Sequence, residues 1–266
     1  METFLPDEEK VAQIWDRLGQ VTDPELDEPV TDLGFIENVA VDRDGGVDVE
    51  FRLPTYWCSA NFAFLMADDM RLSLSTLPWV REVRPQLQDH MVAAEINHGV
   101  RHRQSFSEAL KGFGSADTLD DLREKFRRKA FERRQEAVIL ALRAAGYDDR
   151  AICGMSLAAL DLADLSRTEG AYQMPRYRAL LQERGLAADK AFVTYNGRTI
   201  EPHELAAYLQ RLRAVRINME FNSALCRGLL DARYKDLDQA GATQGCGSEC
   251  AATCSPRVSG PLALQA

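Results

Sequence analysis

The chain has 266 residues, of which 45% are hydrophobic and 27% are charged, and its formal net charge at pH 7 is -9. This composition is that of a globular protein large enough for two domains. The acidic balance disfavours non-specific nucleic-acid binding, which needs a surplus of Lys and Arg facing phosphates. Because the first residues are acidic and no run of about 18 apolar residues follows, we expect no signal peptide, no membrane span and a cytoplasmic location.

The fold class that we expect is α+β, and the first third of the chain predicts a small two-layer α/β domain. Apolar spacing indicates helices, strict alternation indicates strands, and Asp44-Gly45-Gly46 is typical of a hairpin turn. Pro78 is expected to stop the second helix. The expected elements, in the order α-β-β-α-β, are a helix over 11–18, strands over 35–41 and 47–53, a helix over 62–77 and a strand over 79–87.

Cys58 is the residue of this domain with the most reactive chemistry. It lies in Thr55-Tyr56-Trp57-Cys58-Ser59, where a strand gives way to a helix. Its thiol is therefore expected near a helix N-terminus, whose unpaired N–H groups favour the thiolate. The thiolate is the form that acts as a nucleophile and as a metal ligand. The alternative is an ordinary core cysteine packed beside Trp57.

Two turns precede this cysteine, at Asp23-Pro24-Glu25 and at Asp32-Leu33-Gly34. In order along residues 8–92, these turns, the two alternating strands and Thr55-x-x-Cys58 at a helix start resemble the metal-sulfur cluster assembly factor family. That family includes small proteins that help to load iron-sulfur clusters and an accessory protein of the phenylacetate oxygenase.

The resemblance implies that Cys58 is the functional thiol of an assembly protein. Ser59 stands where proline commonly follows the cysteine in bacterial members, and because serine is a good N-cap we expect the helix start to be preserved. The departure leaves open whether the role is general or specialised. The other residues that the resemblance implies for the family motif are Asp23, Glu25, Asp32, Gly34 and Thr55.

The rest of the chain is expected to be a helical addition joined by a polar linker. Glu95, His98 and His102 would share one helix face, and Glu-x-x-His is a motif of di-iron bundles, but those need a second copy. A solvated linker is therefore the favoured interpretation. The expected division is an assembly-like α/β domain at 1–95, a linker at 96–118, a helical domain with a small hairpin at 119–238 and a flexible Cys-rich tail at 239–266.

Within the helical domain, a basic cluster between Arg127 and Arg134 is expected to be a solvated face, with an acidic partner as the alternative. Asn196-Gly197 predicts the hairpin turn. Cys153 and Cys226 are interpreted as core thiols, with Cys226 left open as a further metal ligand. A long helix is predicted from Pro202 to about residue 234, with a buried side made of Leu205, Leu209, Leu212, Val215, Met219, Leu225 and Leu229.

The tail carries the second chemical signal. Cys246, Cys250 and Cys254 are evenly spaced by four residues in a glycine-rich segment. Three thiols so placed can converge on one soft metal, whether iron in an iron-sulfur cluster, zinc or copper(I). The spacing matches no named zinc pattern, and idle cysteines in a disordered tail are the alternative.

These observations favour an accessory protein that assists iron-sulfur cluster or metal-centre maturation of a client enzyme. The cargo would be an iron-sulfur cluster, iron or zinc, bound transiently, and the resemblance suggests a soluble di-iron monooxygenase as the client. No cofactor loop or nucleophile-base-acid set indicates an enzyme. A structural interaction protein and a thiol redox protein remain alternatives, as does a homodimer.

Overall fold

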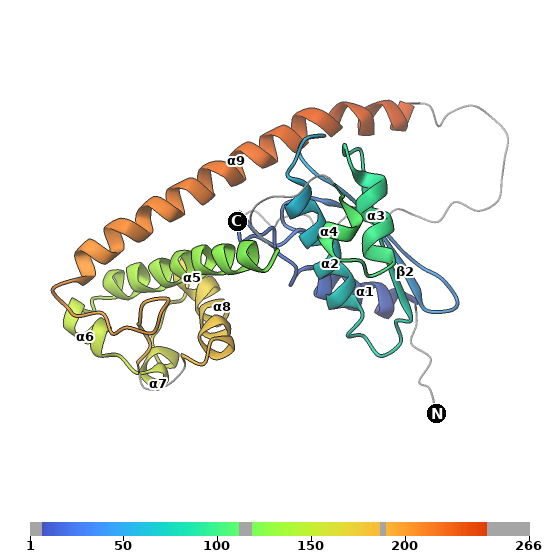
Figure 1. Cartoon of the computed structure of the whole chain (residues 1–266). Coiled ribbons are helices and arrows are strands. Elements are labelled where there is room, and N and C mark those ends of the chain that lie inside the picture. Colours follow the sequence, from blue (N-terminus) through green and yellow to red (C-terminus); the bar gives the residue numbers. More distant parts are fainter. Residues whose placement is uncertain (1–6, 112–118, 187–189, 244–266) are drawn as a thin grey trace.

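The computed structural model describes the backbone of residues 7–111, 119–186 and 190–243, and it describes the side chains of these ranges as far as residue 234. An α/β body and a helical body are joined by one long helix, α9, that extends from one to the other (Figure 1). The α/β body contains α1 Asp7–Leu18, β1 Ile36–Val41, β2 Gly46–Arg52, α2 Ala60–Leu74, β3 Glu82–Gln88, α3 Ala93–Arg101 and α4 Phe106–Ala109. The helical body contains α5 Leu119–Ala144, α6 Asp149–Gly154, α7 Leu157–Asp161, α8 Glu169–Glu183 and the first half of α9 Leu205–Thr243.

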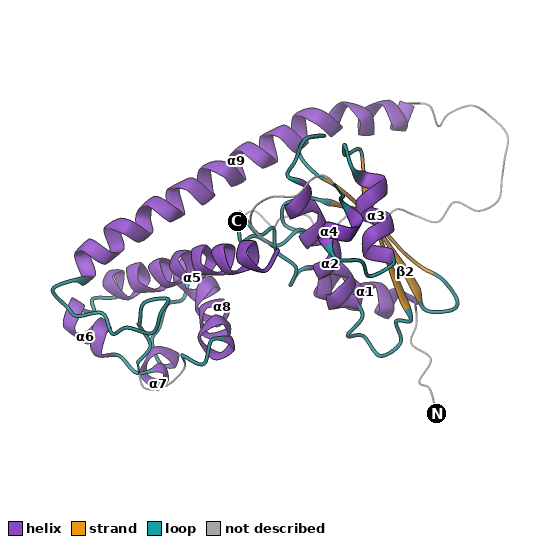
Figure 2. Cartoon of the chain, viewed as in Figure 1, coloured by secondary structure: helices purple, strands orange, loops and turns teal. Residues whose placement is uncertain are grey.

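The α/β body is built on a three-stranded sheet of order β1-β2-β3 (Figure 2). β2 pairs with β1 antiparallel and with β3 parallel, so α2 is the crossover between two parallel strands. In β2 the side chains of Val47, Val49 and Phe51 are fully buried, and the residues between them are polar. One face of the sheet therefore packs on the helices, and the expected α-β-β-α-β unit is confirmed.

Residues expected to form a polar linker instead belong to this body. α3 buries Ile96 and Val100 in the α/β core. The Asn97 side chain accepts from Leu87 N at 2.8 Å and donates to Leu87 O at 3.0 Å, so it satisfies the edge of β3. Gly99 permits close approach of α4, because a Cβ there would lie 2.3 Å from the Cβ of Ala109. Gly99 is thus a packing residue between α3 and α4.

The helical body has its own core, which surrounds a buried polar network. Gln135 is 0% exposed and donates to the Tyr177 hydroxyl and to the carbonyl of Val193, both at 2.7 Å. It accepts from the Tyr208 hydroxyl at 2.6 Å. A buried amide with its hydrogen bonds satisfied stabilises one arrangement of the helices around it. The predicted hairpin is reduced to a single bridge between Val193 and Thr199.

The long helix is confirmed, but its buried side differs from the prediction. Leu225 and Leu229 are 49% and 38% exposed. Once α9 leaves the helical body, the residues that contact the α/β core lie on a different row, which includes Cys226 and Leu230. The prediction assumed that one apolar stripe is buried along the whole helix. The helix instead packs first against the helical body and then against the α/β body, which bury different rows of side chains. Among the described helices, none is both long enough and apolar enough to cross a bilayer.

The two bodies meet at a buried ion cluster centred on Asp27. Asp27 is 2% exposed, and its carboxylate accepts from Arg134 Nε at 2.8 Å and Arg134 Nη2 at 2.5 Å. Arg176 of α8 donates Nη2 to Asp27 Oδ1 at 3.1 Å and to its carbonyl at 2.9 Å. Part of the basic cluster of α5 therefore contacts an acidic turn of its own chain.

We predict that Asp27→Ala destabilises the protein by about 3–5 kcal/mol, because two guanidinium groups would stay buried without a counter-ion. Asp27 has a φ of 55°, which Asn tolerates well, so Asp27→Asn is the matched variant that removes the charge alone. Urea denaturation measures the effect, with the exposed Asp44→Ala as control. A loss below about 1 kcal/mol for Asp27→Ala would contradict the role assigned to this cluster.

Candidate functional site

Cys58 lies directly before the first turn of α2. Ser59 is the N-cap residue and the helix begins at Ala60, as expected, although the Ser59 side chain makes no capping hydrogen bond. The Cys58 thiol is partly exposed, and its Sγ lies 3.3 Å from the Thr55 hydroxyl oxygen. Thr55, which the resemblance implies for the family motif, is therefore placed to hydrogen-bond the sulfur.

His90 fixes the backbone of Cys58 from the other side. Its Nε2 donates to the Cys58 carbonyl at 2.8 Å, and its Nδ1 lies 3.4 Å from Val92 N. His90 is 5% exposed, and burial lowers its pKa, so the ring is neutral at pH 7. Sequence patterns could not single out this histidine, because its hydrogen-bond partner is a backbone atom 32 positions away.

The opening turn places a buried carboxylate in the site. Asp23 is 7% exposed, and its Oδ1 accepts from Glu25 N at 2.8 Å and Leu26 N at 2.9 Å. Burial raises the pKa of Asp23 to about 6, against the lowering effect of these hydrogen bonds. At neutral pH the turn therefore holds a negative charge in surroundings that disfavour it.

Three other residues that the resemblance implies for the family motif, Glu25, Asp32 and Gly34, contact α9. Glu25 Oε1 accepts from Asn222 Nδ2 at 3.4 Å, and the Asp32 carbonyl accepts from Arg227 Nη1 at 2.5 Å. Gly34 has a φ of 73°, and a Cβ there would lie 3.6 Å from Leu230. The turn before the first strand thus lies in contact with α9.

A second cysteine, Cys226 of α9, lies within electrostatic range of Cys58 and of the acidic turn. Both Cys226 and Cys58 pack against the α/β core. The pKa of Cys226 is raised to about 11 by burial and then by the nearby charges of Asp23, Cys58 and Glu25. Cys153, in contrast, is buried in the core of the helical body.

Two exposed aromatic side chains flank Cys58. Trp57 is 72% exposed and Tyr56 is 40% exposed, and their rings meet edge to face with centroids 4.9 Å apart. Trp and Tyr contribute strongly where proteins bind one another. The thiol therefore lies beside a surface suited to protein contact.

Other candidate ligands are not brought into the site. His98 and His102 are exposed and stack on each other, with ring centroids 4.1 Å apart, and Glu95 is exposed on the same helix. The tail cysteines Cys246, Cys250 and Cys254 lie outside the described residues. Across residues 7–111, 119–186 and 190–234, no three His, Cys, Asp or Glu side chains are placed to hold a metal ion.

We predict that iodoacetamide at pH 7 modifies Cys58 at least tenfold faster than Cys153 or Cys226. Burial raises the pKa of Cys153, and a pKa of about 11 leaves only about one Cys226 side chain in 10,000 as thiolate. Peptide mass mapping over time gives the three rates. Equal rates at Cys58 and Cys226 would contradict this assignment of exposure and charge.

We also predict that Asp23→Asn stabilises the protein at pH 7.5 by about 1–3 kcal/mol, since a raised folded-state pKa means that protonation favours folding. In the native protein this contribution is present below pH 4 and lost as pH rises through about 6. The advantage of the variant should therefore shrink towards pH 4. Urea titrations from pH 4 to 8 measure it, with Asp44→Asn as control, and a destabilised variant at every pH would refute it.

Comparison with known proteins assigns part of this architecture. Residues 11–84 match the family model described as iron-sulfur cluster assembly protein. The matched segment runs from α1 into β3 and includes the acidic turn, Thr55 and Cys58, whereas α3, the helical body and α9 lie outside it. No curated protein matches the chain. Residues 11–84 are thus similar to an iron-sulfur cluster assembly domain, and this similarity suggests a role in cluster assembly.

Proposed function

We propose that this protein is a non-catalytic accessory protein that carries an iron-sulfur cluster or iron to a client enzyme, with Cys58 as the transfer thiol. The observation that carries the proposal is the place of Cys58 within the family-matched segment, at the start of α2 and partly exposed. A transfer thiol must be reachable by both donor and client, and this position meets that need.

The surroundings of Cys58 suit a sulfur that binds iron and then releases it. The Thr55 hydroxyl lies 3.3 Å from the sulfur and can donate a hydrogen bond to a Cys58 thiolate, which would draw electron density from the sulfur and weaken its hold on a metal. The His90 hydrogen bond keeps the Cys58 backbone in place without offering its own nitrogen as a ligand. One thiolate held in this way binds cargo less firmly than a closed four-ligand site.

The client is proposed to bind beside the thiol, where Trp57 and Tyr56 are exposed. A second contact surface is available on α9, where Ile217, Phe221 and Leu225 are exposed and follow one another at intervals of one turn. The helical body would then serve client recognition. That the client is a soluble di-iron monooxygenase rests on resemblance to oxygenase accessory proteins.

The tail is proposed as a second ligand set, since Cys246, Cys250 and Cys254 can offer thiolates to the same cargo. A thiol redox protein is the second candidate function. Cys58 and Cys226 both pack against the α/β core, and this function would need them to form a reversible disulfide.

We predict that Cys58→Ala leaves the client enzyme made in normal amount but metal-poor and inactive when the two are co-expressed. The substitution removes one sulfur from a half-buried position, so the loss of stability should be only about 1 kcal/mol. Client iron content and activity are the measurements, and Cys153→Ala is the matched control. Equal maturation with Cys58→Ala would reduce Cys58 to a packing residue and remove the proposal's main support.

A further inference from the structure

Two connections leave the sheet side by side at the edge where Cys58 lies. β2 and β3 are parallel, with Arg52 opposite Gln88 at their last paired position. The chain after β2, residues 53–59, carries Cys58 and is called the thiol loop below. The chain after β3, residues 89–92, carries His90 and is called the supporting segment. Binding groups commonly gather at the carboxyl ends of parallel strands, where such connections adjoin.

The supporting segment holds the backbone of the thiol loop at two carbonyls. Met91 N donates to the Tyr56 carbonyl at 3.1 Å. His90 Nε2 donates to the Cys58 carbonyl at 2.8 Å. The segment begins at Asp89, whose φ of 52° lies in the left-handed region that residues other than glycine seldom adopt. Because such a conformation persists only where surrounding contacts hold it, the position of the thiol loop depends on what holds Asp89.

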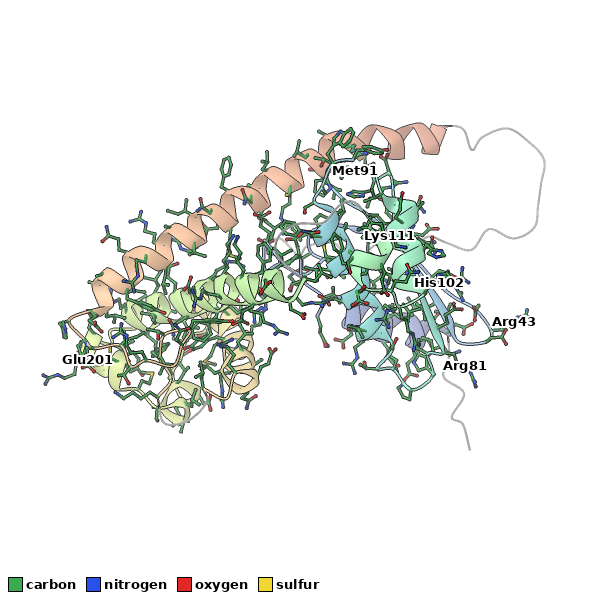
Figure 3. The ribbon with its side chains drawn as sticks, viewed as in Figure 1. Arg43, Arg81, Met91, His102, Lys111 and Glu201 are labelled. Carbon is green, nitrogen blue, oxygen red and sulfur yellow. The ribbon has the colours of Figure 1, made fainter. Side chains whose placement is uncertain are left out.

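Two consecutive residues of α9 hold Asp89. Arg233 Nη2 donates to Asp89 Oδ2 at 2.6 Å and to the Asp89 carbonyl at 3.1 Å. The Tyr234 hydroxyl donates to the same Oδ2 at 3.1 Å, and it lies 3.5 Å from the carbonyl oxygen of Leu53, the first residue of the thiol loop. Figure 3 shows Met91 of the supporting segment directly below the distal part of α9. This helix therefore contacts both connections.

Tyr234 is itself held in a defined position. Its side chain is buried, and the guanidinium groups of Arg52 and Arg233 lie 4.9 Å and 5.1 Å from its ring centroid. Arg52 is fixed in turn by an ion pair with Glu37 of β1 at 2.9 Å. Cations at these distances are attracted to the ring, so the tyrosine has little freedom to move away from Asp89.

We propose that Arg233 and Tyr234 are positioning residues for the transfer thiol, on which they act through Asp89 and His90. Both residues lie outside the family-matched segment, which ends at residue 84. Because α9 begins in the helical body, the added part of the chain supports the thiol directly. The role of Cys58 in transfer rests on the proposed function, whereas the contacts that hold its loop do not.

Loss of the α9 contacts should change the exposure of the Cys58 sulfur. In the native protein this thiol is only partly exposed, and its Sγ lies 3.3 Å from the Thr55 hydroxyl oxygen. Without Arg233 or Tyr234 the supporting segment and the thiol loop can open locally while the core stays folded. Cys58 should then react faster with a small reagent, and Cys153, in the core of the helical body, should not.

The test measures iodoacetamide rates at pH 7 in the full chain. Arg233→Ala and Tyr234→Phe should each raise the Cys58 rate about fivefold, as expected when one or two hydrogen bonds that keep a local segment closed are lost. Arg233→Lys, which keeps a cation able to donate to Asp89, should stay close to the native rate. Arg143→Ala is the matched control, because Arg143 forms a similarly exposed ion pair within the helical body.

A second readout follows the His90 ring. In protein with isotope-labelled histidine, NMR should detect the Nε2 proton of this buried, hydrogen-bonded ring in the native chain and in Arg143→Ala. Exchange with water should weaken the signal in Arg233→Ala and in Tyr234→Phe, because the hydrogen bond to the Cys58 carbonyl opens more often.

A variant that leaves either the Cys58 rate or the His90 signal at its native value removes its residue from the positioning role. A rise in rate shared by Cys153 would overturn the whole inference, since it would mean a general loss of stability. Neither measurement involves iron. Cluster transfer by Cys58→Ser tests the proposed function separately, and failure there would leave the positioning by α9 in place.

Discussion

The acidic turn from Asp23 to Glu28 is the feature on which the rest of the structure depends, because the helical body and α9, which lie outside the family-matched segment, both attach there. Asp27 forms the buried ion cluster with the helical body, and Glu25 and Glu28 bond Asn222 and Arg227 of α9. Asp23 stabilises this turn by accepting hydrogen bonds from the backbone of Glu25 and Leu26. The same turn thus holds both the helical body and α9. Loss of the Asp27 cluster would release one attachment, while the contacts of α9 would remain.

The electrostatics of the site depend on the same turn. Asp23 is ionised at neutral pH although burial raises its pKa to about 6. Burial, and after it the nearby carboxylates, raise the pKa of Cys226 to about 11. Such an arrangement costs stability in the free protein, and groups of this kind concentrate at functional sites. A bound cation would offset the cost of burying the Asp23 carboxylate and would be attracted by the carboxylates that disfavour a thiolate at Cys226. The energetics of the turn therefore agree with a carrier of cationic cargo.

Local patterns were enough to predict the α-β-β-α-β part of the α/β body and the place of Cys58. Alternation in 47–53 and the change from strand to helix at Cys58 depend on residues close in sequence. What could not be predicted depends on distant partners. His90 donates to a backbone carbonyl, and Gly99 is a packing residue for α4. Cys226 packs against the α/β core only because α9 extends from the helical body to the α/β body. The tail cysteines remain a prediction from spacing alone.

The measurement that tests the central claim most directly is cluster transfer from the loaded protein to a separate acceptor. The protein is reconstituted anaerobically with ferrous iron and sulfide, freed of excess reagents and mixed with an apo-ferredoxin of the [2Fe–2S] class, whose visible circular dichroism reports the cluster that it receives. The account predicts transfer from the native chain and none from Cys58→Ser of equal stability. A native chain that takes up no iron and sulfide, or a Cys58→Ser variant that transfers at the native rate, would contradict it.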